Sequence, residues 1–375
     1  MYHDVVIVGG GLGGLVSSIQ LVNKGYKVLV IEKYSYPYNK VCGEYVSNEI
    51  RPFLESLGLN LVNLGAASIN RFLLSAVNGK SIETKLEMGG FGLSRYTLDF
   101  ELFKIAKSLG VEFAENTLVE DIQKINDVFF VETNQGETYE ANVVIGAYGK
   151  RGKLDKTIFR QIPNQGKAYV GVKYHIKYDF PKDLIALHNF KGGYCGISAI
   201  EDDKYCLCYL SDRNNVKHSG GINEMEQEFM YQNPYLLDIF TNAEILFTRP
   251  LVINEINFVP KSAVHNNIMM VGDTAGLITP LAGNGMSIAM HAGVIATSLI
   301  DKFLKKEITR EGMEKTYEKE WNKNFRNRLW RGRQLQKFFG SEFNSNLAVS
   351  MFSKMPFLLP PIIKGTHGEK VEGYD

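Results

Sequence analysis

The first 32 residues constrain the fold of this chain more than any other stretch. Residues 3–8 are almost all apolar, which is typical of a parallel strand buried on both faces. Residues 9–14 read Gly-Gly-Gly-Leu-Gly-Gly and satisfy the spacing G-x-G-x-x-G. An amphipathic helix follows, and a second apolar run, residues 27–31, ends at Glu32. This is the order of a dinucleotide-binding βαβ unit, so we predict an α/β fold with a Rossmann-type domain.

The glycines and Glu32 have separate predicted roles. Gly9 allows a tight turn, Gly11 lets the backbone approach a pyrophosphate, and Gly14 lets the helix pack closely on the strand. The helix N-terminus offers unpaired N–H groups to the phosphates. The carboxylate of Glu32 accepts hydrogen bonds from a ribose and repels a 2′-phosphate, which favours FAD or NAD over NADP. Leu12, Gly13 and Lys33 are assigned to the same site.

Composition and charge exclude several classes of protein. The 375 residues carry a net charge of +1, so nothing attracts the chain generally to nucleic acid. The four cysteines form no C-x-x-C pair, and we predict neither a disulfide framework nor a metal site. Neither a signal-peptide pattern nor an apolar run of 18 residues is apparent. We therefore expect a cytoplasmic protein, and we make no prediction about its oligomeric state.

Local signals divide the rest of the chain. Asn78-Gly79 lies between two strand-like runs and predicts a hairpin, and Ser47 and Thr97 are the expected N-caps of two helices. Strands follow one another between about residues 165 and 260, with one helix near residues 224–231.

We expect a discontinuous Rossmann-type FAD-binding domain interleaved with an antiparallel β-sheet substrate domain and followed by a C-terminal helical segment. The predicted ranges are 1–68, 96–160 and 262–308 for the first domain, 69–95 and 161–261 for the second, and 309–375 for the C-terminal segment.

A second glycine-containing stretch decides between FAD and NAD. A buried strand ends in Gly-Asp, and a Gly-x-Gly sequence then opens a long helix. Asp273 is placed to hydrogen-bond a polyol such as a ribityl chain, and N–H groups at the helix start can stabilise the negative charge of a reduced flavin. This combination favours FAD. The residues assigned to it are Gly272, Asp273, Gly283, Asn284, Gly285 and Met286.

Three blocks together resemble a known class of flavoproteins. They are the N-terminal glycine motif, the segment Arg95–Phe100 with its R-x-x-x-D pattern, and the Gly-Asp segment. Over roughly residues 1–310 the chain resembles the class that contains para-hydroxybenzoate-hydroxylase-type monooxygenases and geranylgeranyl reductases. The resemblance implies that Arg95 lies near the ribityl-pyrophosphate region and that Asp99 supports the helix and loop. Val119 and Gly149 are also expected at the cofactor site.

Residues 40–44 read Lys-Val-Cys-Gly-Glu and resemble the K-x-C-G-E segment that geranylgeranyl reductases carry beside the flavin. The resemblance implies a cofactor-lining role for Cys42 and Gly43. Cys42 can be a proton donor, because hydride delivery to an alkene requires a proton on the other carbon, or it can be a small pocket residue without chemistry. Glu44 is the alternative proton source.

The chain also departs from the class. Hydroxylases usually show Asp-Gly where residues 147–149 here read Ala-Tyr-Gly, and Tyr148 cannot act as a carboxylate. This puts ordinary NADPH docking in doubt, so NAD(P)H would bind transiently or another protein would supply electrons. The W-x-W-x-I-P segment of flavin-dependent halogenases has no counterpart in residues 193–198, which disfavours halogenation.

The second domain is rich in aromatic residues, which could form an apolar pocket over the flavin or be ordinary sheet aromatics. They are Tyr169, Tyr174, Tyr178, Phe190, Tyr194, Tyr205 and Tyr209. His175, an isolated histidine, receives no role. Residues 321–337 are basic and amphipathic, with Trp321, Phe325 and Leu329 on one face. That face would either rest on anionic lipid, as a peripheral membrane contact, or pack on the protein itself.

Three functions follow from these patterns. The first is an FAD-dependent reductase of carbon–carbon double bonds in a hydrophobic small molecule, as in geranylgeranyl reductases. The second is a monooxygenase that hydroxylates an aromatic or polyketide-like substrate. The third is a flavin-binding protein without turnover.

Overall fold

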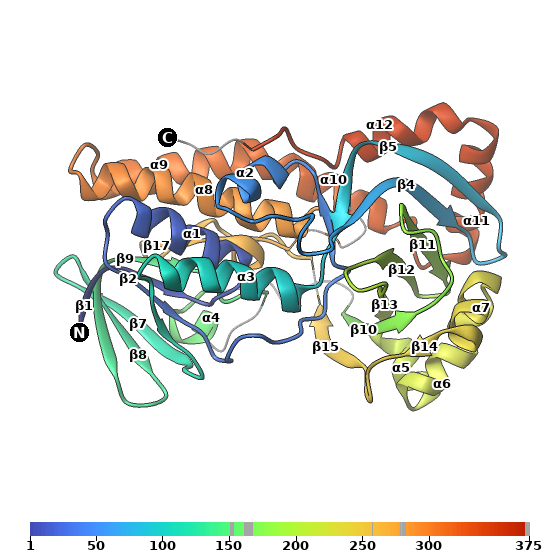
Figure 1. Ribbon diagram of the computed structural model, residues 1–375, viewed down its shortest axis with the longest axis horizontal. Coiled ribbons are helices and arrows are strands. Elements are labelled where there is room, and N and C mark those ends of the chain that lie inside the picture. Colours follow the sequence, from blue (N-terminus) through green and yellow to red (C-terminus); the bar gives the residue numbers. More distant parts are fainter. Residues whose placement is uncertain (151–153, 161–167, 257, 278, 280–282, 372–375) are drawn as a thin grey trace.

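The computed structural model describes residues 1–150, 154–160, 168–256, 258–277, 279 and 283–371. Figure 1 shows two β-sheets side by side, each covered by helices, with the C-terminal helices running along both. This arrangement confirms the predicted class, a mixed α/β fold with a Rossmann-type half and a mainly antiparallel half.

The first sheet is built around β1 (Tyr2–Val8), which the glycine motif follows directly. It lies parallel to β2 (Val28–Ile31) and to β9 (Thr138–Gly146). Because these strands are nearly all apolar and buried, they form the centre of the parallel sheet. The order is β16-β17-β9-β1-β2-β6. The outer members are β6 (Glu112–Ala114), β7 (Val119–Ile125), β8 (Val128–Thr133), β16 (Val264–His265) and β17 (Ile268–Met270).

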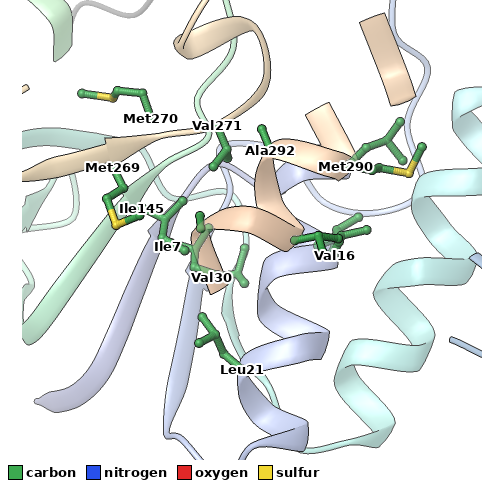
Figure 2. Packing of buried hydrophobic residues seen from close by; sticks show 14 of the residues in the cluster. Ile7, Val16, Leu21, Val30, Ile145, Met269, Met270, Val271, Met290 and Ala292 are labelled. Atoms are coloured by element: carbon green, nitrogen blue, oxygen red, sulfur yellow. The ribbon is translucent and has the colours of Figure 1, made fainter. Parts of the chain in front are cut away.

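Helices α1 (Leu12–Asn23), α3 (Arg95–Ser108) and α8 (Gly285–Leu304) pack beside this sheet. Figure 2 shows Ile7 and Val30 of the strands near Val16 of α1, within a cluster of buried side chains that also includes Met290 of α8. At the α1–α8 crossing a Cβ on Gly13 would lie 3.0 Å from the Ala289 carbonyl oxygen. The two helices therefore approach each other closely through a glycine.

α8 is also long and apolar enough to cross a membrane, contrary to the expectation that no such run exists. However, 61% of its apolar window is buried inside the molecule, as in the core helix of a folded domain.

The second sheet has the order β14-β10-β13-β12-β11-β4-β5-β3, and β15 pairs with β10. Its strands are β3 (Tyr45–Ser47), β4 (Ala67–Ser75), β5 (Ser81–Gly92), β10 (Tyr169–Lys177), β11 (Leu184–Phe190), β12 (Gly193–Ala199), β13 (Tyr205–Asp212), β14 (Glu244–Ile245) and β15 (Leu251–Ile256). The hairpin predicted at Asn78-Gly79 joins β4 and β5.

Each face of the second sheet has its own helical cover. One face packs on a group formed by α5 (Arg213–Ser219), α6 (Ile222–Met225), a π-helical turn (Glu226–Met230) and α7 (Pro234–Asn242). The opposite face packs on α11 (Glu342–Lys354) and α12 (Leu359–Lys364) through Val349 and Leu359. The single helix predicted near residues 224–231 is therefore part of a larger group.

Both predicted N-caps were wrong. Ser47 ends β3, and α2 (Arg51–Ser56) begins four residues later. The N-cap of α3 is Ser94, whose hydroxyl accepts a hydrogen bond from the Thr97 N–H. β3 belongs to the second sheet, whereas residues 1–68 are assigned to the first domain. The remaining domain limits stay predictions.

The C-terminal segment continues from α9 (Arg310–Trp321) through a π-helical turn (Asn322–Arg326) to α10 (Asn327–Gln336). Trp321, Phe325 and Leu329 are buried in the core of the first domain. The apolar face formed by these three residues therefore packs on the protein itself, which was one of the two alternatives.

Candidate cofactor and active site

The β1–α1 turn has the shape of a phosphate cradle. Gly9 has a φ of +105°, and a Cβ there would lie 2.4 Å from the Ala147 carbonyl oxygen. A Cβ on Gly14 would lie 2.1 Å from the Gly9 carbonyl oxygen, which agrees with its predicted packing role. The N-cap of α1 is Gly11, and no side chain caps the helix. The first-turn N–H groups are thus left for an anion.

Two cationic side chains, Lys40 and Arg95, lie close to this turn. A Cβ on Gly11 would lie 3.8 Å from Lys40 Nζ and 4.0 Å from Arg95 Nη2. Asp99 holds both, with 2.7 Å from Arg95 Nε to Oδ1 and 2.9 Å from Lys40 Nζ to Oδ2. Burial by itself would raise the pKa of Asp99, but Arg95 and Lys40 hold it below the ordinary value. Asp99 is therefore an ionised support, as the resemblance implies, and Lys40 is a site residue that sequence reasoning missed.

Glu32 lies at the carboxyl end of β2, as predicted, and it is buried. Its Oε2 accepts a hydrogen bond from the Gly10 N–H at 2.8 Å. Lys33 is exposed, with Nζ 4.9 Å from the centre of the Tyr34 ring. Val119 is buried at the start of β7. These residues form the end of the site where a nucleoside would lie.

Asp273 lies in a 3-10 turn (Gly272–Thr274) that follows the buried strand β17. Its carboxylate is half-buried and makes no hydrogen bond with any residue that the structure describes. Burial raises its pKa, and the nearby Arg95 opposes that shift. An unpartnered carboxylate at this position fits a polyol with hydroxyl donors. Beside it, the Gly149 N–H donates to Thr274 Oγ1 at 2.8 Å.

The start of α8 faces the same region. Gly283 has a φ of +64°, and the N-cap Asn284 makes no side-chain cap, so the first amides of α8 stay open. Asn284 instead donates from Nδ2 to the Thr366 carbonyl oxygen at 2.7 Å. Gly285 is the first residue of α8, and Met286 Sδ lies 3.7 Å from Cys42 Sγ. The loop at residues 40–44 therefore reaches the α8 N-terminus.

Cys42 is a protonated thiol. Burial raises its pKa above the ordinary value, and the opposing effect of Arg95 is smaller. A thiol in this state can donate a proton and is not an activated nucleophile. The next residue, Gly43, has open space where a Cβ would be.

Glu44 is the centre of a buried charge cluster. Its Oε1 is bonded to Lys173 Nζ and accepts the Arg95 N–H at 2.7 Å, and its Oε2 lies 2.7 Å from His175 Nε2. Burial by itself would raise the pKa of Glu44, but Lys173 and His175 hold it below its ordinary value. Glu44 is therefore an ionised carboxylate and not a ready acid. His175, to which the sequence analysis assigns no role, belongs to the site together with Lys173.

The sheet face toward this cluster changes from polar to apolar. Lys173 and His175 lie on it beside Cys206, in the registers of β10 and β13. Farther along the same face lie Leu210 and Tyr194, packed in the apolar cluster that α11 and α12 cover.

Alternation along the strands places the aromatic residues on different faces. Of the aromatic residues proposed as a pocket, Tyr169 and Tyr194 share the face of Lys173. Tyr174 and Tyr209 point the other way and donate to Glu226 at 2.9 and 2.7 Å. They belong to the core against α6, as the alternative reading allowed. Tyr148 donates to Asp155 Oδ1 at 2.8 Å.

Taken together, the uncapped α1 N-terminus, the two cations and the unpartnered Asp273 fit the pyrophosphate and ribityl parts of FAD. Comparison with known proteins agrees with this fit. Residues 2–327 match the family model described as FAD binding domain.

Two curated relatives align with almost the whole chain. The conditioned medium factor receptor 1 of Dictyostelium discoideum is 26% identical, over 93% of this chain and 70% of that protein. The digeranylgeranylglycerophospholipid reductase of Methanococcus vannielii is also 26% identical, over 95% of this chain and 96% of that protein.

Solved structures share the fold. A geranylgeranyl bacteriochlorophyll reductase-like protein from Thermoplasma acidophilum superimposes with a TM-score of 0.78 and 18% identity, covering 97% of this chain and 94% of that chain. A flavin-dependent brominase, Bmp2, gives a TM-score of 0.77 and 17% identity, covering 97% and 94%.

Proposed function

We propose that this chain, which belongs to the family of FAD-binding domains and is an FAD-dependent oxidoreductase, reduces carbon–carbon double bonds in a hydrophobic substrate of the polyprenyl-lipid class. Reduced FAD supplies the hydride in such a reaction. The protein must then bind the cofactor, place an apolar chain against it and deliver one proton for each hydride.

The observation that carries the proposal is the position of residues 40–44. This loop lies between the phosphate cradle, which Lys40 faces, and the sheet face, which Glu44 and Cys42 contact through Lys173 and Cys206. Its thiol is protonated and adjoins the N-terminus of α8. A proton donor is thus present where the cofactor site meets the second sheet.

Residues of the chain bind the cofactor and donate the proton. Lys40 and Arg95 bind the pyrophosphate, Asp273 binds the ribityl hydroxyls, and the amides that open α8 stabilise negative charge. Cys42 donates the proton to the carbon that does not receive hydride.

The thiolate that remains must be protonated again. His175 contacts Glu44 on one side and borders an open cleft of about 330 Å³ on the other, together with Thr97 and Phe247. His175 therefore borders both this cleft and the loop, so water of the cleft is the nearby source of that proton. The electron donor in this proposal is NAD(P)H bound transiently, or another protein.

A monooxygenase is the second candidate, because Tyr169 is partly exposed on the sheet face that carries Lys173 and suits a flat aromatic substrate. The test is to reduce the FAD-loaded protein by light without oxygen, add geranylgeranyl lipid, and analyse the lipid by mass spectrometry. We expect two hydrogen atoms to be gained per double bond reduced. If labelled dioxygen is supplied and the label appears in the product, the protein is instead a monooxygenase. If neither an electron donor nor light reduces the bound FAD, the result would support a flavin-binding protein without turnover.

A further inference from the structure

An exposed apolar stripe runs along α11. Phe343, Leu347 and Met351 follow one another at intervals of four residues and are 75%, 59% and 39% exposed. Met355 and Phe357, in the turn after the helix, continue the stripe. Large side chains four residues apart lie on one face of a helix, so these form a continuous apolar surface.

The opposite side of α11 packs against the second sheet. Val349 is fully buried in the apolar cluster under the second sheet, and Leu359 of α12 is buried in the same cluster. Figure 1 shows α11 and α12 beside β4 and β5, at the end of the molecule away from the N-terminus. Both helices are therefore anchored, and the stripe is an outer surface that nothing in the described chain covers.

The stripe lies in the most basic part of the chain. Residues 323–364 contain eight lysines and arginines, of which Arg328 is buried against Glu49, but only one acidic residue, Glu342, whereas the whole chain has a net charge of +1. Lys337, Lys354 and Lys364, which flank α11 and α12, are exposed. An apolar surface edged by cations is complementary to a lipid surface with anionic headgroups.

We propose that α11 and the turn Pro356–Leu358 dock this protein onto an anionic lipid bilayer. α11 has 13 residues and is roughly 20 Å long at 1.5 Å per residue, too short to cross the hydrocarbon core. α11 and the segment Pro356–Lys364 are together long and apolar enough for a span, but a bend of 108° separates them, with Met355 and Phe357 exposed at the bend. This geometry suits a helix lying in the interface rather than spanning it.

The charge argues for lipid rather than for a second copy of the chain. A two-fold dimer through this surface would bring Lys337 and Lys354 of each copy toward a surface with the same positive surplus. A bilayer containing phosphatidylglycerol brings the opposite charge. The proposed lipid contact is thus α11 with the turn Pro356–Leu358, and not residues 321–337, which were one of two alternatives in the sequence analysis. The docking does not depend on the reaction.

The experiment is co-flotation of the FAD-loaded protein with vesicles of phosphatidylcholine alone or with one quarter phosphatidylglycerol. We expect binding to the anionic vesicles that weakens at 0.5 M salt. The combined variant Phe343→Ser, Leu347→Ser and Phe357→Ser should bind at least tenfold more weakly. The matched control is Val62→Ser, Leu109→Ser and Ile125→Ser, which replaces exposed apolar side chains elsewhere and should bind like the parent.

Bound FAD and the melting temperature verify that both combined variants are folded. Three outcomes would overturn the proposal. One is no binding of the parent to anionic vesicles, and another is equal binding by the parent and the α11 variant. The third is a parent that is dimeric in sedimentation, does not bind vesicles and becomes monomeric in the α11 variant, which would assign the stripe to contact between copies.

Discussion

At Glu44 one buried carboxylate joins the two halves of the molecule. It belongs to the loop that reaches the phosphate cradle, and its partners Lys173 and His175 belong to the second sheet. Its φ of +57° is an unusual conformation for a glutamate, held here by hydrogen bonds from both sides. The charge state of the cluster therefore affects both stability and chemistry.

The first prediction concerns Lys173→Met. Burial would lower the pKa of Lys173, but Glu44 raises it, so the pair stabilises the fold between the acidic range where Glu44 is protonated and the alkaline range where Lys173 is neutral. Removing the cation leaves Glu44 buried without its main partner, at a cost of about 3–5 kcal/mol at neutral pH. The pKa of Glu44 then rises, so the deficit should shrink as the pH falls.

Urea unfolding at pH 5 and pH 8 measures this effect. Lys182→Met, which breaks the exposed pair of Lys182 with Asp203, is the control and should change the free energy of unfolding by less than about 1 kcal/mol. An equal loss in both variants would mean that the buried pair adds no specific stability.

The second prediction separates the two roles of Cys42. If Cys42 is the proton donor, the substitution Cys42→Ala should lower turnover roughly 10²-fold or more, while the affinity for FAD stays unchanged. Cys195→Ala, which alters the buried core on the opposite sheet face, should keep its turnover. Reduction rates in water and heavy water check the assignment, because loss of the donor also changes the solvent isotope effect. Turnover of Cys42→Ala within a factor of a few of the parent would make Cys42 a pocket residue.

At the scale of elements, the sequence predicted the features that depend on residues close together in the chain. The glycine motif, β1, α1 and β2 followed from hydrophobic periodicity and spacing, and the α8 start followed from its glycines. Helix caps were mistaken because Ser94 and Thr97 are equivalent by residue type, and only the backbone turn selects Ser94. His175 was missed because its partner lies 131 residues away. A lysine inside the apolar strand β10 was the available signal for that cluster.

The third prediction tests the β1–α1 turn. Gly14→Ala places a Cβ 2.1 Å from the Gly9 carbonyl oxygen, which α1 can relieve only by moving off β1. We expect loss of FAD binding together with a melting temperature several degrees lower. Gly312→Ala in α9 is the control, because its nearest neighbour is the Thr309 hydroxyl at 3.3 Å. Calorimetry with and without FAD gives both quantities, and retained FAD affinity in Gly14→Ala would contradict the role of this turn.

At the scale of the whole molecule, the C-terminal segment connects distant parts of the chain. After α12, the chain returns to the FAD-binding side, where the Thr366 carbonyl oxygen accepts from Asn284 at 2.7 Å and from Arg328 Nε at 3.1 Å. Arg328 also binds Glu49 at 2.7 Å, and Glu49 accepts the Gly368 N–H. No local pattern predicts this network, since its members are joined only by tertiary folding.

The fourth prediction concerns this network. Arg328 and Glu49 are both buried, so Arg328→Met should destabilise the fold by about 3–5 kcal/mol by leaving Glu49 unpaired. FAD should also dissociate faster, because Thr366 then loses one of the two donors that fix it beside the α8 N-cap. Adding Glu49→Leu should restore much of the stability, since the uncompensated charge is removed.

Arg331→Met, which loses a contact with the same tail at the exposed Gly365 carbonyl oxygen, should cost less than about 1 kcal/mol. Unfolding free energies of the parent, Arg328→Met, Glu49→Leu and the double variant give the coupling. If the double variant is no more stable than Arg328→Met, the loss comes from the tail contacts alone, and the buried ion pair is not what holds the C-terminal segment to the cofactor domain.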